Sequence, residues 1–218
     1  MVQVKICGIT RLVDAEAAVE WGANALGFIF AKSPRQITPQ KARDITWKVS
    51  PFVKTVGVFV NKHPAEIMKI MAFCGLDLVQ LHGDESVSAC SKMAPRVIKA
   101  FRIRGEETLQ EMVAYKNHVR AILLDTYQKG FNGGTGKIFD WQLAIQAKES
   151  GIPMVLSGGL NPENVWEALL RVNPSAIDVS SSIEESPGIK DHERMGMFME
   201  KVTDFHRSKK AIGGHTLK

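Results

Sequence analysis

Apolar residues along this chain gather in eight short runs, separated by longer stretches with helical spacing. The runs lie near Val2–Cys7, Ala25–Phe30, Thr55–Val60, Leu76–Leu81, Val97–Phe101, Ala121–Asp125, Met154–Ser157 and Ala176–Val179. Each is short and rich in β-branched or apolar residues, which is typical of a buried strand. Their starts recur every 21 to 33 residues, about the length of a strand, two loops and a helix.

The segments between these runs carry signals for helix ends. Thr38-Pro39 predicts an N-cap followed by proline at the first helical position, and Asn161-Pro162-Glu163 repeats the pattern before Val165–Leu170. His63-Pro64 opens another helical segment, which Cys74-Gly75 closes. Strands and helices therefore alternate along the chain.

Eight such units predict an α/β fold, a single-domain (β/α)8 TIM barrel, because parallel strands need helical crossovers and eight strands close a barrel. The alternative is an open doubly wound sheet, which usually has a glycine-rich dinucleotide loop after its first strand. Here that strand ends in Cys7-Gly8-Ile9-Thr10. We expect the barrel to cover residues 1–206 and a flexible C-terminal tail to cover 207–218.

Composition and charge exclude several classes of protein. The 218 residues are 44% hydrophobic, which suits one large domain. The longest apolar run, Ala25–Ala31, is too short to cross a membrane. The net charge of +5 is spread along the chain apart from Arg207 to Lys210, so we expect no nucleic-acid partner. The first residues lack a signal-peptide layout, and three widely spaced cysteines suggest no disulfide framework, so a reducing cytoplasm is expected.

Polar residues follow the predicted strands where a barrel carries its chemistry, at the carboxyl ends. Loops after strands seven and eight frequently bind phosphate, and glycines let the backbone approach an anion. Gly158 and Gly159 follow the seventh strand, and Ser180, Ser181 and Ser182 follow the eighth. We predict a phosphate site there; the alternative is a pair of ordinary tight turns.

Two residues at strand ends could act as a base and an acid. A cysteine at a strand end is by default a small buried hydrophobe, but beside cations Cys7 could hold a lowered pKa. Asp125 brings a carboxylate to the end of an apolar strand, where partial burial can raise its pKa. The alternative is a structural carboxylate, and Asp178 poses the same question. Cys74 and Cys90 lie in helical segments and are expected in the core.

Other polar residues could bind a substrate. Arg35 follows the second strand and could clamp a carboxylate with two hydrogen bonds, although a loop arginine is commonly a surface residue. His82 is either a polar group of the mouth or a turn residue. The run at 133–137 resembles a nucleotide phosphate loop, but Ile138 stands where Ser or Thr is needed. No zinc-binding spacing appears, so we expect neither a metal nor a cofactor.

In this order, these residues resemble the phosphoribosylanthranilate isomerase family. The matching stretches run from Val4 to Asp191 and comprise Val4–Thr10, Gly27–Phe30, Ser33–Arg35, Val79–Gly83, Leu124–Thr126, Gly133–Gly136, Phe139–Trp141, Leu156–Leu160, Asp178–Ser181, Pro187-Gly188 and Lys190-Asp191. One departure is Ser182, where the family usually has glycine. A side chain there would crowd the loop if the backbone needed a positive φ.

The resemblance implies a general base at Cys7, a general acid at Asp125 and a carboxylate clamp at Arg35. We assign His82 and Asp178 to substrate binding as well. The implied reaction is an Amadori rearrangement in tryptophan biosynthesis that needs no cofactor and takes a small phosphorylated substrate. We expect a monomer or homodimer. Rival hypotheses are another sugar-phosphate isomerase or lyase and a non-catalytic barrel that only binds a phosphorylated metabolite.

Overall fold

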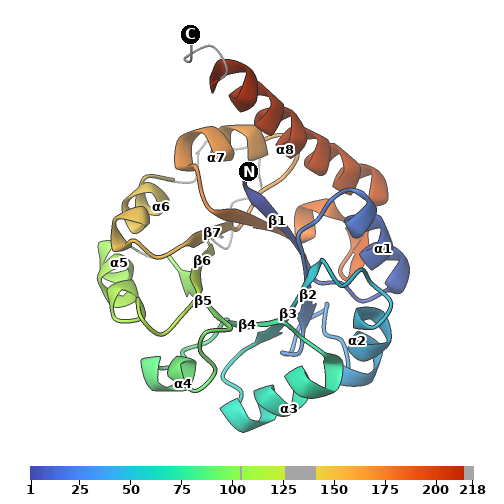
Figure 1. Ribbon diagram of the computed structural model, residues 1–218, viewed down its shortest axis with the longest axis vertical. Helices are drawn as coiled ribbons and strands as arrows, with labels where there is room; N and C mark the ends of the chain where they lie inside the picture. Colours follow the sequence, from blue (N-terminus) through green and yellow to red (C-terminus); the bar gives the residue numbers. More distant parts are fainter. Residues whose placement is uncertain (104, 126–140, 214–218) are drawn as a thin grey trace.

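The computed structural model describes residues 1–103, 105–125 and 141–213, and its strands form one closed barrel (Figure 1). The eight barrel strands are β1 (Gln3–Cys7), β2 (Ala25–Ile29), β3 (Lys54–Phe59), β4 (Leu78–Leu81), β5 (Val97–Arg102), β6 (Ala121–Asp125), β7 (Met154–Ser157) and β8 (Ala176–Val179). All neighbours pair in parallel, and β1 closes the barrel against β8. The predicted TIM barrel is confirmed, and the open sheet is excluded.

Helices ring the barrel on its outer side (Figure 1). They are α1 (Leu12–Glu20), α2 (Pro39–Thr46), α3 (Pro64–Cys74), α4 (Val87–Ser91), α5 (Glu106–Val113), α6 (Trp141–Ala147), α7 (Val165–Val172) and α8 (His192–Gly213), with 3₁₀ turns η1 (Lys148–Ser150) and η2 (Ser181–Ile183). Along the chain, each crossover helix therefore follows one strand and precedes the next parallel strand, as the spacing of the apolar runs predicts.

The predicted helix ends are largely confirmed. The Thr38 side chain caps α2 by accepting a hydrogen bond from the Lys41 N–H, and Pro39 occupies the first turn. Gly75 ends α3 in the left-handed conformation with φ 68°. Helix α7 begins at Val165, later than the Asn161 signal suggests, because the Asn161 side chain instead caps the turn at residues 162–164.

The apolar core has two parts, as expected for strands whose successive side chains alternate between inside and outside. The larger part lies between the strands and the helices. The smaller part fills the barrel interior and consists of Val56, Ile98, Ala100, Leu123 and Val155.

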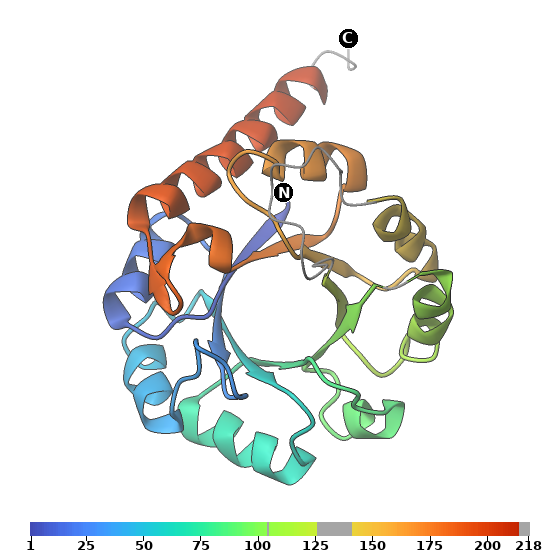
Figure 2. The ribbon, with the colours of Figure 1, turned by 180° about the vertical axis from the view of Figure 1, so that it is seen from behind.

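A small hairpin follows η2 and precedes the last helix. It consists of β9 (Glu184–Ser186) and β10 (Ile189–Lys190), with Gly188 at φ 85° in its turn. Thr10 donates a hydrogen bond to the Gly188 carbonyl, which holds the hairpin against the loop after β1. Figure 2 shows it in orange beside β1 and α1 in blue. The sequence patterns did not predict this hairpin.

Helix α8 runs past the expected start of the tail. It continues to Gly213, so the boundary predicted at residue 206 lies within a helix. Lys209 extends this helix's contacts by donating to the Asn173 side chain at 2.9 Å, at the end of α7. The rest of the expected tail, residues 214–218, lies outside the described residues, as does the glycine-rich run at 133–137. Across residues 1–103, 105–125 and 141–213, no helix combines the length and the apolar character that crossing a membrane requires.

Candidate active site

The barrel mouth at the carboxyl ends of the strands collects the predicted polar residues. Cys7 ends β1, Asp125 ends β6 beside Ser157 of β7, and Asp178 lies near the end of β8. Parallel strands bring all of these ends to one face, where TIM barrels carry their active sites. The mouth has two sides that differ in burial and in bonding.

Cys7 is a free, buried cysteine at the end of β1. Burial raises the pKa of its thiol above the ordinary value, because a thiolate loses water there. The neighbouring charge of Lys5 opposes this rise, Asp178 adds to it, and Lys190 also opposes it. Cys7 thus lies among cations, as a basic cysteine requires, but in a site that disfavours charge.

Lys5 lies on the same strand and the same inward face as Cys7. Its Nζ is 2.8 Å from Oδ1 of Asp178, and both side chains are buried. Oδ2 of Asp178 accepts a hydrogen bond from the Ser157 hydroxyl at 3.2 Å. Burial alone would lower the pKa of Lys5, but Asp178 and Cys7 outweigh it and raise that pKa, so the amine stays protonated. Both oxygens of Asp178, a predicted substrate-binding residue, therefore have protein partners.

Lys190 of the hairpin joins the backbone of the mouth to Glu184. Its fully buried Nζ donates to the Cys7 carbonyl at 2.6 Å, the Ser180 carbonyl at 3.2 Å and Oε1 of Glu184 at 2.9 Å. Three acceptors satisfy the three protons of an ammonium group. Lys190 therefore fixes the ends of β1 and β8 relative to each other.

Arg35 is tied to the same carboxylate. Its Nε lies 2.9 and 2.8 Å from the two oxygens of Glu184, and its Nη2 lies 2.6 Å from Oε2. Burial would raise the pKa of Glu184, but Arg35 and Lys190 outweigh it and hold that pKa below its usual range. Within the described part of the chain, Nη1 of Arg35 has no hydrogen-bond partner. Glu184 therefore holds the guanidinium group of Arg35 along the edge formed by Nε and Nη2.

On the opposite side of the mouth, His82 meets Asp125. Nε2 of His82 is 3.3 Å from Oδ2 of Asp125, and both side chains are about one fifth exposed. The other ring nitrogen, Nδ1, is 3.0 Å from the amide nitrogen of the buried Gln80. The structure therefore brings His82 to the mouth, where it contacts both Gln80 and Asp125.

The loop that carries His82 is anchored by a third buried lysine. Lys99 Nζ donates to the Gly83 carbonyl at 2.6 Å and lies 3.2 Å from Oε2 of Glu85. The Glu85 carboxylate in turn accepts from the Asn61 and Gly83 backbone N–H groups at 2.8 and 3.0 Å. This pair lies behind β4 and β5 and holds their connecting loop.

The predicted phosphate loops lie side by side after β7 and β8. Gly158 and Gly159 both have positive φ, 85° and 68°, a conformation that favours glycine. A side chain at Gly159 would meet no described atom within 4 Å, so this loop borders open space. The Ser180 hydroxyl donates to the Cys7 carbonyl at 3.1 Å, which links the second loop to β1.

Ser182 does not create the predicted crowding. Among the described residues, only Asn61 and Asn173 combine a side chain with a positive φ, so Ser182 has ordinary backbone geometry. Its hydroxyl donates to the Leu160 carbonyl and ties the two loops together. Because the backbone at residue 182 does not need a positive φ, serine is tolerated there in place of the family's usual glycine.

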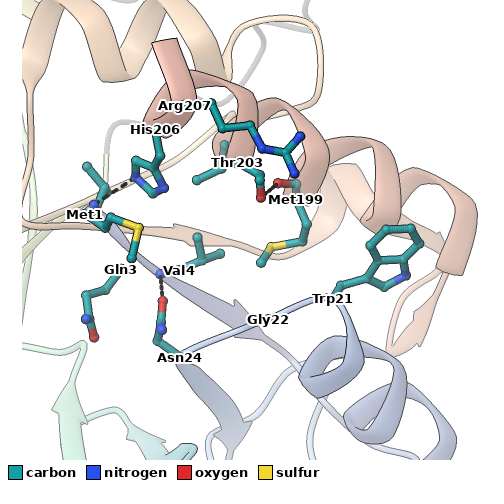
Figure 3. Close-up of a pocket in the computed structure, with 12 residues that line it drawn as sticks. Met1, Gln3, Val4, Trp21, Gly22, Asn24, Met199, Thr203, His206 and Arg207 are labelled. Atoms are coloured by element: carbon teal, nitrogen blue, oxygen red, sulfur yellow. Dashed lines mark hydrogen bonds between the residues drawn. The ribbon is translucent and has the colours of Figure 1, made fainter. Parts of the chain in front are cut away.

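A separate hollow of about 280 Å³ lies at the other end of the barrel. Figure 3 shows it between the start of β1, the Trp21–Asn24 turn and α8. His206 faces it and accepts a hydrogen bond from the Val2 N–H at 2.9 Å. None of the predicted site residues lines this hollow, so the mouth remains the candidate active site.

The sequence reasoning missed three charged residues of the mouth, namely Lys5, Glu184 and Lys190. Lys5 had a usable signal, because residues two apart on a strand share a face and Cys7 was already a candidate. Glu184 and Lys190 belong to the hairpin, and Glu184 contacts a residue 149 positions away. No local pattern announces such a contact.

Comparisons with known proteins agree with this architecture. The family model described as N-(5'-phosphoribosyl)anthranilate (PRA) isomerase matches residues 4–201. The N-(5'-phosphoribosyl)anthranilate isomerase of Geobacter sp. (strain M21) is 51% identical over 200 residues, which are 91% of this chain and 97% of the relative.

Two solved structures are also similar. One, a phosphoribosyl anthranilate isomerase in complex with reduced 1-(o-carboxyphenylamino)-1-deoxyribulose 5-phosphate, has TM-score 0.84 and 44% identity over 94% of this chain and 100% of its own. The other, monomers of the dimeric isomerase from Thermotoga maritima, has TM-score 0.83 and 43% identity over the same shares. The chain therefore belongs to the N-(5'-phosphoribosyl)anthranilate isomerase family and is an isomerase of tryptophan biosynthesis.

Proposed function

We propose that this isomerase converts N-(5'-phosphoribosyl)anthranilate to 1-(2-carboxyphenylamino)-1-deoxyribulose 5-phosphate by general acid and base catalysis at the barrel mouth. The observation that carries the proposal is the placement of Cys7 and Asp125 at the ends of two strands of one barrel. A thiol and a carboxyl group at a common mouth can move the two protons that an aldose-to-ketose rearrangement requires.

Asp125 is the proposed acid. In its protonated form it donates a proton to the ribose ring oxygen, the C–O bond breaks, and the ring opens to an iminium ion. The contact between Asp125 and His82 at 3.3 Å supports this role, since it orients the carboxyl group. The acid contributes where charge develops, on the leaving ring oxygen.

Cys7 is the proposed base. As a thiolate it removes the proton from C2 of the iminium ion, and the electron pair of that C–H bond forms the enolamine. The enolamine then tautomerises to the ketone, which completes the rearrangement without gain or loss of electrons. Lys5 and Lys190 beside the sulfur support a thiolate here, although burial keeps the thiol pKa raised in the free enzyme.

The two anionic ends of the substrate need separate partners. We assign the anthranilate carboxylate to Arg35, whose Nη1 edge faces away from Glu184. We assign the phosphate to backbone N–H groups of Gly159 and Ser180 to Ser182, where the open space beside Gly159 supports an anion site. Bound phosphate on other groups of the mouth would contradict this assignment.

The assembly and compartment are also proposals. A dimer is supported by the Thermotoga maritima relative, which is described as dimeric. Sedimentation at micromolar concentration distinguishes it from a monomer. Three buried free cysteines support a role in the reducing cytoplasm.

The decisive experiment measures turnover of the anthranilate substrate by the purified protein and by Cys7→Ser. A serine hydroxyl is too weakly acidic to form the needed anion near neutral pH. We expect Cys7→Ser to nearly abolish turnover, while the affinity for the reduced product analogue changes only a few-fold. Turnover by Cys7→Ser close to wild type would remove Cys7 from the mechanism. A wild-type protein that binds the analogue without turnover would be a binding protein.

A further inference from the structure

Lys5 places a positive charge under the proposed base. Lys5 and Cys7 are separated by one residue on β1, so their side chains leave the strand on the same inward face. The Lys5 Nζ is 2.8 Å from Oδ1 of Asp178, to which it donates a hydrogen bond, and its positive charge opposes the rise in the pKa of the Cys7 thiol. The sulfur, the ammonium and the carboxylate thus form one buried cluster at the floor of the mouth.

Gly27 on the neighbouring strand makes room for this cluster. It is paired with Cys7 in the barrel register. A Cβ at this position would lie 2.7 Å from the Cys7 sulfur and 3.0 Å from the Lys5 Nζ. Any larger residue would therefore displace the two groups from the space that they share.

We propose that Lys5 is a positioning residue that stabilises the Cys7 thiolate, with Asp178 holding the ammonium group against the sulfur. This inference rests on the proposed role of Cys7 as the base. Lys5 acts through the sulfur and is not assigned a contact with substrate. It also gives Asp178 a function other than substrate binding.

The bonding of Lys5 differs from that of a purely structural buried lysine. Lys99 donates to three backbone carbonyls, those of Leu81, Gly83 and Ala100, in addition to Glu85. Within the described residues, Lys5 has no carbonyl acceptor; it donates to Asp178 and shares the space beside Gly27 with the Cys7 sulfur. A purely structural ammonium would be expected to use all three protons on fixed acceptors.

The alternative role for Lys5, as the base itself, conflicts with its surroundings. Asp178 and Cys7 raise the pKa of Lys5, so it is protonated at neutral pH and cannot accept a proton. A protonated amine near the sulfur instead favours the anionic thiolate. Lys190 favours it too, whereas burial and Asp178 oppose it. The balance of these groups makes the ionisation of Cys7 sensitive to each of them.

The test measures the ionisation of Cys7 in the free protein, without substrate. Iodoacetamide alkylation is followed against pH, and the Cys7 peptide is quantified by mass spectrometry apart from those of Cys74 and Cys90. Lys5→Met removes the charge at similar length. At a fixed pH below the thiol pKa, we expect Lys5→Met to slow Cys7 alkylation by about tenfold or more, because a buried unit charge near the sulfur is lost.

Two further variants keep the test sharp. Lys99→Met is the matched control, since it removes a buried, ion-paired lysine away from Cys7, and the pH dependence of Cys7 alkylation should not change. Asp178→Asn removes the opposing negative charge with little change in shape. We expect it to speed alkylation at the same pH, which is the opposite sign to Lys5→Met. If Lys5→Met does not fold, Lys5→Gln replaces it, and the same slowing of Cys7 alkylation is expected because the charge is lost.

The outcomes separate this inference from the proposed reaction. Equal pH dependence of alkylation in the wild type, Lys5→Met and Asp178→Asn overturns the role of Lys5, even if the wild-type protein turns over the anthranilate substrate. The expected opposite shifts in a protein without that turnover support the pairing and reject the proposed reaction. In an active protein, the rise of kcat/KM with pH should occur at a higher pH in Lys5→Met than in the wild type, because the pKa of the Cys7 thiol is higher.

Discussion

The two sides of the barrel mouth are built differently. The side formed by β1 and β8 holds Cys7 and a buried network of charged groups, in which lysines bond carboxylates and backbone carbonyls. The side formed by β4 and β6 holds His82 and Asp125, which are about one fifth exposed and joined by one contact of 3.3 Å. We call these the β1/β8 side and the β4/β6 side.

This difference follows from what each side is proposed to do. A thiolate must exist in a place that water does not stabilise, so fixed cations have to replace the solvent. A carboxylic acid that delivers a proton needs only orientation and access to the ring oxygen. The β1/β8 side therefore surrounds its proposed base with fixed charges, and the β4/β6 side places its proposed acid in a partly exposed position. Substitutions on the two sides should produce different kinetic and stability changes.

On the β4/β6 side, the largest effect is expected from Asp125→Asn. The amide keeps the size of the side chain but cannot donate an acidic proton as the ring opens. We expect kcat to fall by roughly 10²–10⁴-fold, the usual contribution of one positioned proton transfer, with little change in KM. Steady-state kinetics with the anthranilate substrate measure both constants. A large rise in KM with unchanged kcat would assign Asp125 to binding.

The next effect is on stability and comes from the anchor behind the β4/β6 side. Lys99→Met leaves the buried Glu85 carboxylate without its cation and removes the Lys99 donor from three carbonyls. Breaking a buried ion pair from one side costs about 3–5 kcal/mol, and we expect that loss in the free energy of unfolding by urea. Lys54→Met is the control, because the Lys54 side chain is 58% exposed in its pair with Asp77. We expect that loss to stay within about 1 kcal/mol. Equal losses in both variants would show that the buried Lys99–Glu85 pair stabilises the fold no more than an exposed ion pair does.

The fold could be predicted from sequence because its signals are local. The eight apolar runs identify the strands, and Thr38-Pro39 marks the start of α2 where the structure has it. The parallel arrangement then determines that Cys7, His82 and Asp125 meet at one mouth. The extension of α8 to Gly213 was not predicted, because the polar residues after 206 are typical of a flexible tail. In the structure, Lys209 contacts Asn173 at the end of α7, a contact that the local sequence does not indicate.

The electrostatic detail of the site could not be predicted in the same way. It depends on contacts between residues far apart in sequence, such as Lys5 with Asp178 and Arg35 with Glu184. The hairpin that carries Glu184 is short and polar, so no hydrophobic period announces it. Ser182 is a second example, because the sequence predicted crowding there that depended on a positive φ. Only the backbone geometry shows that the side chain is tolerated.

The smallest expected effect tests whether Arg35 belongs to binding, and it comes from Arg35→Met. The substrate carboxylate is negative before and during the reaction, so a clamp on it contributes mainly uniform binding. A hydrogen bond to a charged group contributes about 1.5–3 kcal/mol, and we therefore expect KM to rise by roughly 10- to 100-fold with a smaller fall in kcat. Arg171→Met is the control, because Arg171 pairs with Glu167 on the half-exposed surface of α7, and its KM should stay at the wild-type value. Glu184 complicates the variant, since among the described residues its buried carboxylate then keeps Lys190 alone as a charged partner. Unfolding by urea measured alongside the kinetics separates that structural cost from the loss of binding. A fall in kcat with unchanged KM would place Arg35 in the chemical step and remove the distinction between clamp and catalyst.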